Sequence, residues 1–408
     1  MFRRSHRARL LLVGTIASTV LASACGGDDV PTSDGGSERD AGGRDDGGLN
    51  PDAGPDSDSG THSDAGSDSR SDAGLDPSRP VFVYVGQTNG DLVVHALEGD
   101  TLVERSRTRT GNLPSFLAPS ADGRFLYVVH EGASEVAALA VTPGTGAVSV
   151  IDREATGGGP THVETDGRFV FTANYGGGSV SVFPLEADGT LRPASATLRS
   201  GSETHQVVVD RAREHLYVPS KGEDLVAQYT LGADGPAPSD PPTVGTRRGS
   251  GPRHLALDPS QTHAYVIHES DRTVTVHDVN GDGTLGDSRQ RVDTLPDGAP
   301  ASGSTAEILV HPSGRFVYGS NRGHDSVVVF RIEGDGTLTL VEHERTRGNH
   351  PRSMTLTPDG TRLIVANLHS DDVQVFVVDG ATGALEHRTT LRTSAGPFFV
   401  GAFAIAAE

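Results

Sequence analysis

Residues 251–269, GPRHLALDPSQTHAYVIHE, carry the pattern that recurs through most of this chain. Two β-prone runs, Leu255–Asp258 and His263–His268, flank a Pro-Ser-Gln-Thr break, which predicts a β-hairpin. In an antiparallel pair joined by a tight turn, the start of one strand lies beside the end of the next. We therefore expect Arg253 and Glu269 to lie together, at the end of the hairpin away from its turn.

From Pro80 onward the same pattern repeats, with an aromatic or branched residue at a fixed place in each copy. These residues, spaced 43 to 53 positions apart, are Tyr84, Tyr127, Phe171, Tyr217, Tyr265, Tyr318 and Ile364. This period is typical of a four-stranded propeller blade, so seven copies predict an all-β, seven-bladed β-propeller. Glycine-bearing turns such as 282–285 are expected to join third strands to fourth strands. The first copy lacks an innermost strand, and we expect residues 396–403 to supply it and close the ring.

Residues 1–25 have the layout of an export signal, with four Arg before an apolar run at Leu10–Leu21 and a cysteine, Cys25, just beyond it. The layout resembles a bacterial lipoprotein signal, whose Cys becomes lipid-modified. An ordinary cleaved signal, with Cys25 incidental, is the alternative. The sequence predicts an exported protein that faces the periplasm or the cell surface and is anchored to the membrane through lipid on Cys25.

Residues 26–79 form a low-complexity segment rich in Gly, Ser and Asp, which predicts a disordered tether. It carries thirteen Asp and one Glu against four Arg, about half of the formal charge of -20. That charge argues against a nucleic-acid partner, because phosphates require a basic face. Residues 80–408 are predicted to form the propeller, which we expect to be monomeric. With one cysteine in the chain, an internal disulfide is excluded.

Polar residues recur at two positions of the repeat that should meet at one mouth of the central channel. The starts of the innermost strands contribute His162, His205, Arg253, His254, Glu307 and Arg352, and the ends of the second strands contribute Glu131, Asn174, Ser220, Glu269, Arg322 and Asn367. Such a set suits acyl transfer to water, in which a His or Glu takes a proton and Arg holds an anion or oxyanion. A covalent nucleophile is not evident, because Cys25 lies outside the fold and the G-x-S-x-G motif is missing.

Each of these residues also has a structural interpretation. A His at a strand start is more often a satisfied structural group, which applies to His162, His254 and His268. The residues Asn174, Asn321 and Asn367 recur at one blade position and are expected to hold the blade turn. Arg253 and Glu269 could form an ion pair without catalysis. Residues 278–289 imitate a calcium loop but end in Arg where a Glu ligand is required, so we assign them to a hairpin turn and predict no metal or cofactor.

Several stretches resemble the lactonase family of seven-bladed propellers, which includes one type of bacterial 6-phosphogluconolactonase and fungal carboxymuconate-cyclising enzymes. They are Leu113–Ala118 (LPSFLA), Ala173–Phe183 (ANYGGGSVSVF), Gly251–His254 (GPRH), Tyr265–Glu269 (YVIHE), Ala306-Glu307 and Ser320–Phe330 (SNRGHDSVVVF). The resemblance implies hydrolysis of a small-molecule lactone by four residues: His205, Arg253, Glu269 and Arg322. Either His205 or Glu269 would be the general base, and the two Arg would hold the carbonyl or a substrate anion. We assign substrate binding to four further residues: His254, Glu307, Arg352 and Glu131.

The chain departs from the family pattern at three places. A family His-Pro-His is Glu203-Thr204-His205 here, a Pro-Asp-Leu-Gly is 219–222 (PSKG), and the Asn before Glu269 is His268. These changes predict an altered substrate, with His268 the first place to look. Export also argues against 6-phosphogluconolactone itself, which is a cytoplasmic metabolite. The alternative function is a non-catalytic propeller that binds a partner protein or a sugar acid.

Overall fold

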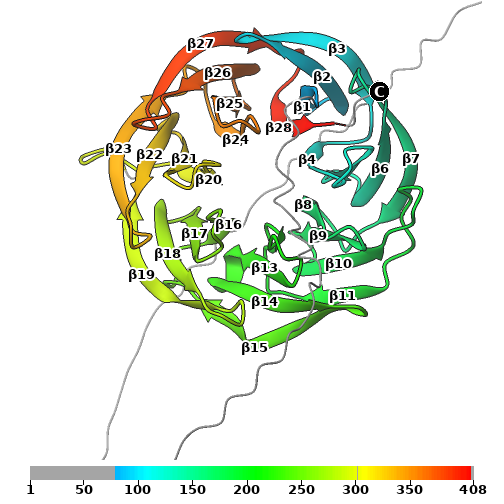
Figure 1. Ribbon diagram of the computed structural model, residues 1–408, viewed down its shortest axis with the longest axis horizontal. Helices are drawn as coiled ribbons and strands as arrows, with labels where there is room; N and C mark the ends of the chain where they lie inside the picture. The colour runs from blue at the N-terminus through cyan, green and yellow to red at the C-terminus, as the bar shows by residue number, and fades with distance from the viewer. Residues whose placement is uncertain (1–78, 301, 406–408) are drawn as a thin grey trace, which may run out of the picture. The chain divides into compact units, whose positions relative to one another are not determined.

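The computed structural model of the chain describes residues 79–300 and 302–405. These residues form seven four-stranded antiparallel sheets, arranged as blades around a ring (Figure 1). The predicted seven-bladed, all-β propeller is therefore confirmed. The expected export signal at 1–25, with Cys25, and the expected tether up to residue 78 lie outside the described residues.

Each blade runs from a strand beside the ring centre to a strand at the rim (Figure 1). The innermost strands are β4 (Pro114–Pro119), β8 (Pro160–Thr165), β12 (Val208–Val209), β16 (Pro252–Leu257), β20 (Ser304–Val310), β24 (Pro351–Leu356) and β28 (Pro397–Ala404). The second strands are β1 (Val81–Gln87), β5 (Phe125–His130), β9 (Phe169–Asn174), β13 (His215–Ser220), β17 (His263–His268), β21 (Phe316–Arg322) and β25 (Arg362–Asn367). Every anchor residue of the sequence repeat lies on a second strand.

The third strand of each blade is largely buried, and the fourth strand is amphipathic or exposed. The third strands are β2 (Asp91–Glu98), β6 (Glu135–Val141), β10 (Ser179–Pro184), β14 (Leu225–Gly232), β18 (Thr273–Val279), β22 (Ser326–Ile332) and β26 (Asp372–Val378). The fourth strands are β3 (Thr101–Arg109), β7 (Val148–Ala155), β11 (Ala196–Arg199), β15 (Gly235–Gly245), β19 (Leu285–Asp293), β23 (Leu338–Arg345) and β27 (Leu385–Arg392). A 3₁₀ turn, η1 (Lys221–Glu223), follows β13.

The ring is closed by strands from both ends of the described chain. The C-terminal strand β28 pairs antiparallel with β1, with Tyr84 opposite Gly401, and Figure 1 shows β28 in red beside β1 in blue. The prediction that residues 396–403 complete the first blade is confirmed. Closure pairs β1 on both of its sides, so the first strand of the described chain does not leave an open edge.

The hydrophobic core is divided among the interfaces between neighbouring blades. Buried side chains form seven clusters in the described residues, and each cluster combines residues of two adjacent blades. One of them joins Val83 and Val85 of the first blade to Ile364 and Ala366 of the last. Burial of apolar area, about 25 cal/mol per Å², therefore stabilises the whole ring rather than single blades.

Second-strand tyrosines add a hydrogen bond across four of these interfaces. The hydroxyl of Tyr265 donates to the carbonyl oxygen of Gly336 at 3.1 Å, and Tyr84, Tyr217 and Tyr318 make the same bond to Gly146, Gly283 and Gly383. Each glycine lies in the turn between the third and fourth strands of the next blade, as predicted for these turns. Gly336 has φ +82, and a Cβ there would lie 2.3 Å from the His263 ring, so only glycine fits.

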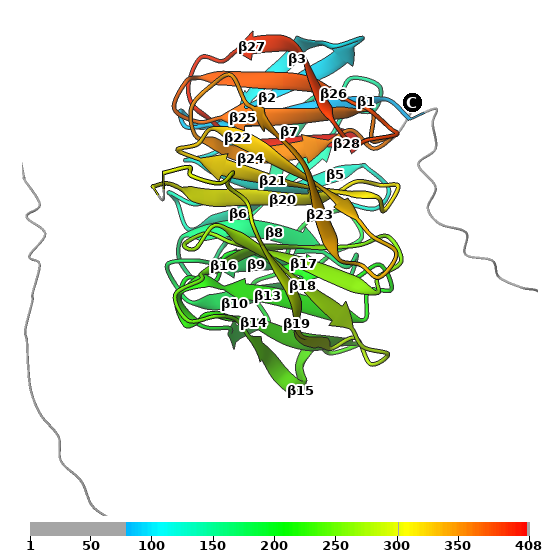
Figure 2. The same cartoon turned by 90° about the vertical axis from the view of Figure 1, so that its left-hand side faces the viewer.

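The hairpin at 251–269 has the predicted form with one difference. Its first strand, β16, begins at Pro252 rather than Leu255, because a bulge near Arg253 lets the pairing with β17 extend to Pro252 opposite His268. Figure 2 shows the ring edge-on, with strands that run across its thickness. The innermost strands therefore begin at one face of the ring, and the second strands end there.

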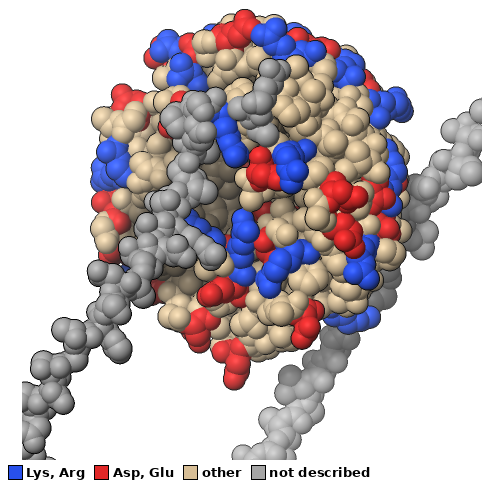
Figure 3. Space-filling view, turned by 45° about the vertical axis from the view of Figure 1, so that its right-hand side comes forward, with Lys and Arg blue, Asp and Glu red and all other residues tan. Residues whose placement is uncertain are grey.

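The surface of the ring carries mixed charge. Lys and Arg side chains alternate with Asp and Glu over the face shown in Figure 3, so this face is not uniformly basic. None of the helical segments in residues 79–405, as far as these are described, is long and apolar enough to cross a bilayer.

Candidate active site

Strand register places the residues that line the channel in three tiers. The rim tier directly follows or ends the second strands: Glu131, Tyr175, Lys221, Glu269 and Arg322. The middle tier lies at the start of the innermost strands, one residue past their first paired position: Thr161, His205, Arg253 and Arg352. The floor tier is one residue further along: Phe116, His162, Gln206, His254 and Glu307.

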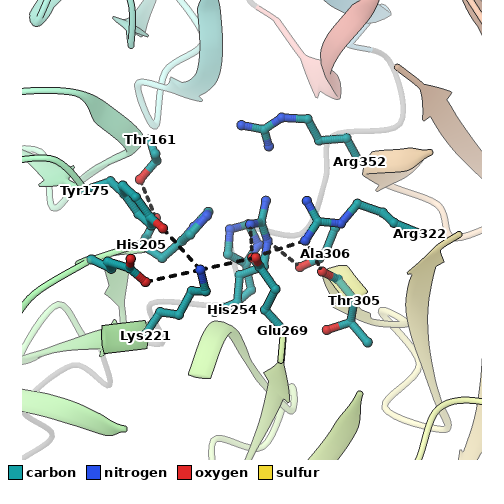
Figure 4. Close-up of polar contacts among 12 residues, drawn as sticks. Thr161, Tyr175, His205, Lys221, His254, Glu269, Thr305, Ala306, Arg322 and Arg352 are labelled. Carbon is teal, nitrogen blue, oxygen red and sulfur yellow. Dashed lines mark hydrogen bonds and ion pairs between the residues drawn. The ribbon is translucent and has the colours of Figure 1, made fainter. Parts of the chain in front are cut away.

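An ion cluster forms where the rim and middle tiers meet. One carboxylate oxygen of Glu269 lies 2.5 Å from Nη1 of Arg253 and 3.2 Å from Nη2 of Arg322. Its other oxygen lies 3.4 Å from Nζ of Lys221. The predicted contact between Arg253 and Glu269 is thus confirmed, and Arg322 of the next blade joins it. Figure 4 shows Lys221, Glu269 and Arg322 converging on one point.

The cations around Glu269 control its protonation. Burial alone would raise the pKa of its carboxyl group, but the charges of Arg253, Arg322 and Lys221 outweigh burial and lower the pKa from 4.5 to about 2. Glu269 is therefore fully ionised at neutral pH. A carboxylate held in this way is a weak proton acceptor, so its position suits it to orient the two arginines.

Backbone carbonyls fix the orientation of both arginines. The Nε atom of Arg253 donates to the carbonyl oxygen of Ala306 at 3.1 Å, and Nη2 of Arg322 donates to that of Thr305 at 2.7 Å. Burial and the nearby charge of Arg253 lower the pKa of Arg322 to about 10, which leaves it charged at neutral pH. The two guanidinium groups form a rigid positive pair that faces the channel.

A third guanidinium, Arg352, reaches the mouth from β24 (Figure 4). It lies 3.7 Å over the ring of Phe398, and its Nη2 is 3.5 Å from a carboxylate oxygen of Glu131. Burial and the charge of Arg253 lower the pKa of Arg352 to about 9. Its positive charge is less completely paired than that of Arg253. Arg352 and Glu131 both lie at the mouth, and their role in substrate binding stays a prediction.

Lys221 and Tyr175 also belong to the rim tier, and sequence reasoning missed them both. The Lys221 ammonium lies 3.1 Å from the Glu203 carboxylate and donates to the hydroxyl of Tyr175 at 3.1 Å. The backbone N–H of Lys221 donates to the carbonyl of Glu203, as that of Glu269 does to Gly251. This equivalence was available in the sequence, because both residues follow a second strand at the same place in the repeat.

His205 lies in the middle tier beside the ion cluster. Its ring contacts the rings of Tyr175 and His254 edge-on, with centroid distances of 5.6 Å and 5.1 Å. Its backbone is held by Pro219 and by the hydroxyl of Thr161, which donates to the His205 carbonyl at 2.8 Å. Burial, together with the charge of Arg253, lowers the pKa of His205 well below 6.5, so the imidazole is neutral and can accept a proton.

The floor tier separates the mouth from a cavity inside the channel. His254 and Glu307 are both buried, and Nδ1 of His254 lies 2.6 Å from a carboxylate oxygen of Glu307. The His162 ring stacks on Phe116 with a centroid distance of 3.7 Å. Below them lies a largely apolar cavity of 340 Å³. Glu307 was expected at a strand start, but it is the fourth residue of β20 and therefore lies deeper than the mouth.

Three expected mouth residues instead point into the blades. Asn174 donates to Ser181 at 2.9 Å, and Asn367 donates to the carbonyl of Thr346 at 3.1 Å, so the structural interpretation of these residues is confirmed. Asn321, at the same blade position, donates to the carbonyl of Thr294. Ser220, the last of the three expected mouth residues, is fully buried and donates to the carbonyl of Ser200.

His268 does not mark the substrate site, and the prediction that it would do so is wrong. Its ring is fully buried inside the fifth blade, with Nε2 2.8 Å from the Thr275 hydroxyl. The alternation of side chains along β17 turns His268 away from the mouth, while Glu269, beyond the strand end, faces it.

Metal chemistry has no ready ligand set in the described part of the chain. Within residues 79–300 and 302–405, no group of three His, Cys, Asp or Glu side chains is arranged to hold a metal ion. The segment that imitates a calcium loop is the turn between β18 and β19, where Asp282 accepts a hydrogen bond from the backbone of Thr284 at 3.0 Å. Its assignment to a turn is confirmed.

Fold and mouth together define a propeller with an Arg-Glu-Arg cluster and neutral histidines at one end of its channel. The sequence profile of the family described as "Lactonase, 7-bladed beta-propeller" matches residues 83–400. The chain belongs to this family.

Named relatives share most of the chain. The 6-phosphogluconolactonase of Klebsiella pneumoniae (strain 342) is 31% identical over 315 residues, which cover 75% of this chain and 94% of that protein. The 6-phosphogluconolactonase of Bacillus subtilis (strain 168) is 31% identical over 299 residues, 68% of this chain and 83% of that protein. The solved structure of a periplasmic gluconolactonase of Pseudomonas aeruginosa is 27% identical, with a TM-score of 0.73, and covers 80% of this chain and 99% of that one.

Proposed function

We propose that this protein is a lactone hydrolase that opens a sugar lactone, or a related lactone, by attack of water at the channel mouth. The observation that carries the proposal is the Arg253–Glu269–Arg322 cluster beside neutral histidines in a chain of the lactonase family. The named relatives act on sugar lactones, with or without a phosphate.

The geometry suits the charge that develops during the reaction. A guanidinium group has five N–H donors, and Glu269 and Ala306 occupy two of those on Arg253. The remaining donors of Arg253 and Arg322 can hold the carbonyl oxygen as it becomes an oxyanion. Glu269 keeps both arginines in place before the substrate arrives, so the site is preorganised.

The decisive experiment measures hydrolysis of a lactone panel that includes gluconolactone and 6-phosphogluconolactone. The purified protein should open at least one lactone faster than its His205→Ala and Arg253→Ala variants do. If every lactone is opened at the same rate by all three proteins, the proposal is wrong. Melting temperatures of the variants must be measured alongside, so that unfolding is not mistaken for lost chemistry.

The alternative of a non-catalytic binding propeller depended on the predicted tether and on changed residues around the site. Two of these, Ser220 and His268, are buried inside blades and do not reach the mouth. The third, Glu203, pairs with Lys221 at the rim and leaves Arg253 and Glu269 in contact. The altered residues therefore do not favour loss of catalysis.

We further propose that the enzyme is exported and held on the membrane through lipid on Cys25. The Arg-rich start, the apolar run and the position of Cys25 support this, and a relative from Pseudomonas aeruginosa is described as periplasmic. A Cys25→Ala variant of the full chain should leave the membrane fraction while keeping its lactonase activity. Unchanged fractionation would exclude lipid anchoring through Cys25.

A further inference from the structure

The floor tier contains a carboxylate–imidazole pair that lies directly below the arginine cluster. The Nδ1 atom of His254 is 2.6 Å from Oε1 of Glu307, and the two residues are only 3% and 4% exposed. Glu307 is itself fixed, because its backbone N–H donates to the Ser320 hydroxyl at 2.9 Å and its carboxylate accepts from the backbone of Ile308 at 3.3 Å. The pair is therefore rigid.

This contact decides which nitrogen of His254 carries the proton. A carboxylate only accepts hydrogen bonds, so Nδ1 of His254 must carry the hydrogen, and Nε2 keeps its lone pair. The Nε2 atom is buried and has no hydrogen-bond partner among the described residues. Because Glu307 fixes the ring and Nε2 has no other partner in the described part of the chain, this nitrogen is free to accept a proton.

The other two candidate bases are less well equipped. Glu269 is held by three cations and has a pKa of about 2, which makes it a poor proton acceptor. His205 is neutral, but its Nδ1 atom has no partner among the described residues, and a carboxylate does not orient its ring. A general base is normally oriented by a third group, and among the described residues of the three tiers only His254 combines a neutral imidazole with a carboxylate partner.

We propose that His254 is the general base of the lactone hydrolase and that Glu307 is its positioning residue, an inference that rests on the function proposed above. Water attacks the lactone carbonyl carbon while one of its protons moves to Nε2 of His254. The C–O bond of the ring then breaks, and the proton on Nε2 passes to the leaving alkoxide oxygen. The new carboxylic acid releases its own proton to solvent, so the products are a hydroxycarboxylate and a proton.

The surroundings of His254 support this role at neutral pH. Burial lowers the pKa of His254, the charge of Glu307 on β20 raises it in part, and the charges of Arg253 and Arg352 lower it again. The rings of His162 on β8 and of His205 also face His254, at centroid distances of 5.7 Å and 5.1 Å. The net result is a neutral imidazole that becomes charged only when it takes the proton from water.

Two variants test the assignment, with His268→Asn as the matched control. His268 is equally buried and close in the chain, but it points into the blade and Asn is the family residue there. We expect His254→Asn to lower kcat by about 10² to 10⁴. Glu307→Gln should lower kcat by about 10- to 100-fold with KM unchanged. As the pH is lowered, the kcat of Glu307→Gln should begin to fall at a lower pH than the wild-type kcat does, because loss of the Glu307 charge lowers the pKa of His254.

The outcomes separate this inference from the proposed function. If the wild type is active and His254→Asn, folded by circular dichroism, keeps kcat within about threefold, the base assignment is wrong and the lactonase function stands. If His254→Asn does not fold, the pH profile decides: an acidic limb of kcat in Glu307→Gln that coincides with that of the wild type overturns the assignment. A wild type that opens no lactone in the panel overturns the lactonase function, and the base assignment with it.

Discussion

The two ends of the ring use the same seven repeats in opposite ways. At the end away from the mouth, the blades repeat the same contacts: second-strand tyrosines donate to glycine carbonyls of the next blade in four places. At the mouth, equivalent positions carry different residues. The rim tier alone holds two carboxylates, a tyrosine, a lysine and an arginine.

This contrast shows which contacts build the fold and which carry out its chemistry. A contact that several blades repeat stabilises the ring, and the loss of one copy leaves the copies in the other blades intact. A contact that occurs in one blade, such as Arg253 with Glu269, has no counterpart elsewhere in the described ring to replace it. Variants at the mouth should therefore change catalysis, and variants at the other end should change stability alone.

Among the variants that test this contrast, the largest effect is expected at Arg253. Replacing it with Ala removes a donor for the developing oxyanion and leaves Glu269 with Arg322 and Lys221 alone. We expect kcat/KM to fall by about 10² to 10³. The control is Arg331→Ala, which breaks the exposed pair with Glu333 on the outer part of the ring and should leave kcat/KM unchanged. Steady-state kinetics of the two variants on one lactone measure the difference, and equal losses would contradict the contrast between mouth and exterior.

A pH-dependent effect on stability is expected at Glu269. Its pKa is about 2 in the folded protein against an ordinary 4.5, so its pairing with the cations is fully present above pH 4.5 and is lost as the pH falls toward 2. The shift corresponds to about 3 kcal/mol. Wild type should exceed Glu269→Gln in free energy of unfolding by this amount at pH 7, and the gap should close toward pH 2 in urea titrations.

The exposed carboxylate Glu386 provides the control for this prediction. It pairs with Arg388 on the outer strand β27, where water screens the interaction. Glu386→Gln should match the wild type at every pH. The difference in free energy of unfolding between the wild type and Glu269→Gln could also stay constant from pH 7 to pH 2.5. That result would mean that the surrounding cations do not lower the pKa of Glu269.

A smaller effect is expected at Lys221, the rim residue at which this chain departs from the family pattern. Its ammonium group contacts Glu203 and Glu269, and its side chain is partly exposed. Lys221→Met should raise KM about fivefold with little change in kcat, because a partly screened ion pair contributes about 1 kcal/mol. A fall in kcat larger than the rise in KM would place Lys221 in the chemical step instead.

The sequence predicted the features that recur from blade to blade. It did not predict the contacts between neighbouring blades, because these depend on how the blades are arranged in space. The period and the turn glycines fix the blades, and antiparallel pairing brings Arg253 to Glu269 within one hairpin. The contact between His254 and Glu307 joins positions 53 residues apart on neighbouring blades. Whether such side chains meet depends on the angle between blades and on burial, which a pattern along one strand does not contain.

The remaining errors concern whether a side chain at a strand end points toward the channel mouth or into its own blade. Ser220 and His268 end their strands beside the mouth, but strand alternation and blade twist turn both into the sheet. Lys221 was compared with the family only as part of 219–222, and its side chain was not assigned to the mouth. Its place in the repeat, one residue after the strand end like Glu269, would have identified it.

The smallest effects should come from the end away from the mouth, where two tyrosines at the same repeat position differ in one bond. The Tyr265 hydroxyl donates to Gly336 at 3.1 Å, whereas the Tyr127 hydroxyl is buried with no partner in the described residues. Tyr265→Phe should lower the free energy of unfolding by about 1 kcal/mol, and Tyr127→Phe should leave it unchanged or raise it slightly. Both variants should keep wild-type kcat. Equal destabilisation by the two variants in chemical unfolding would show that ring packing, and not the bond between blades, is what the tyrosine position supplies.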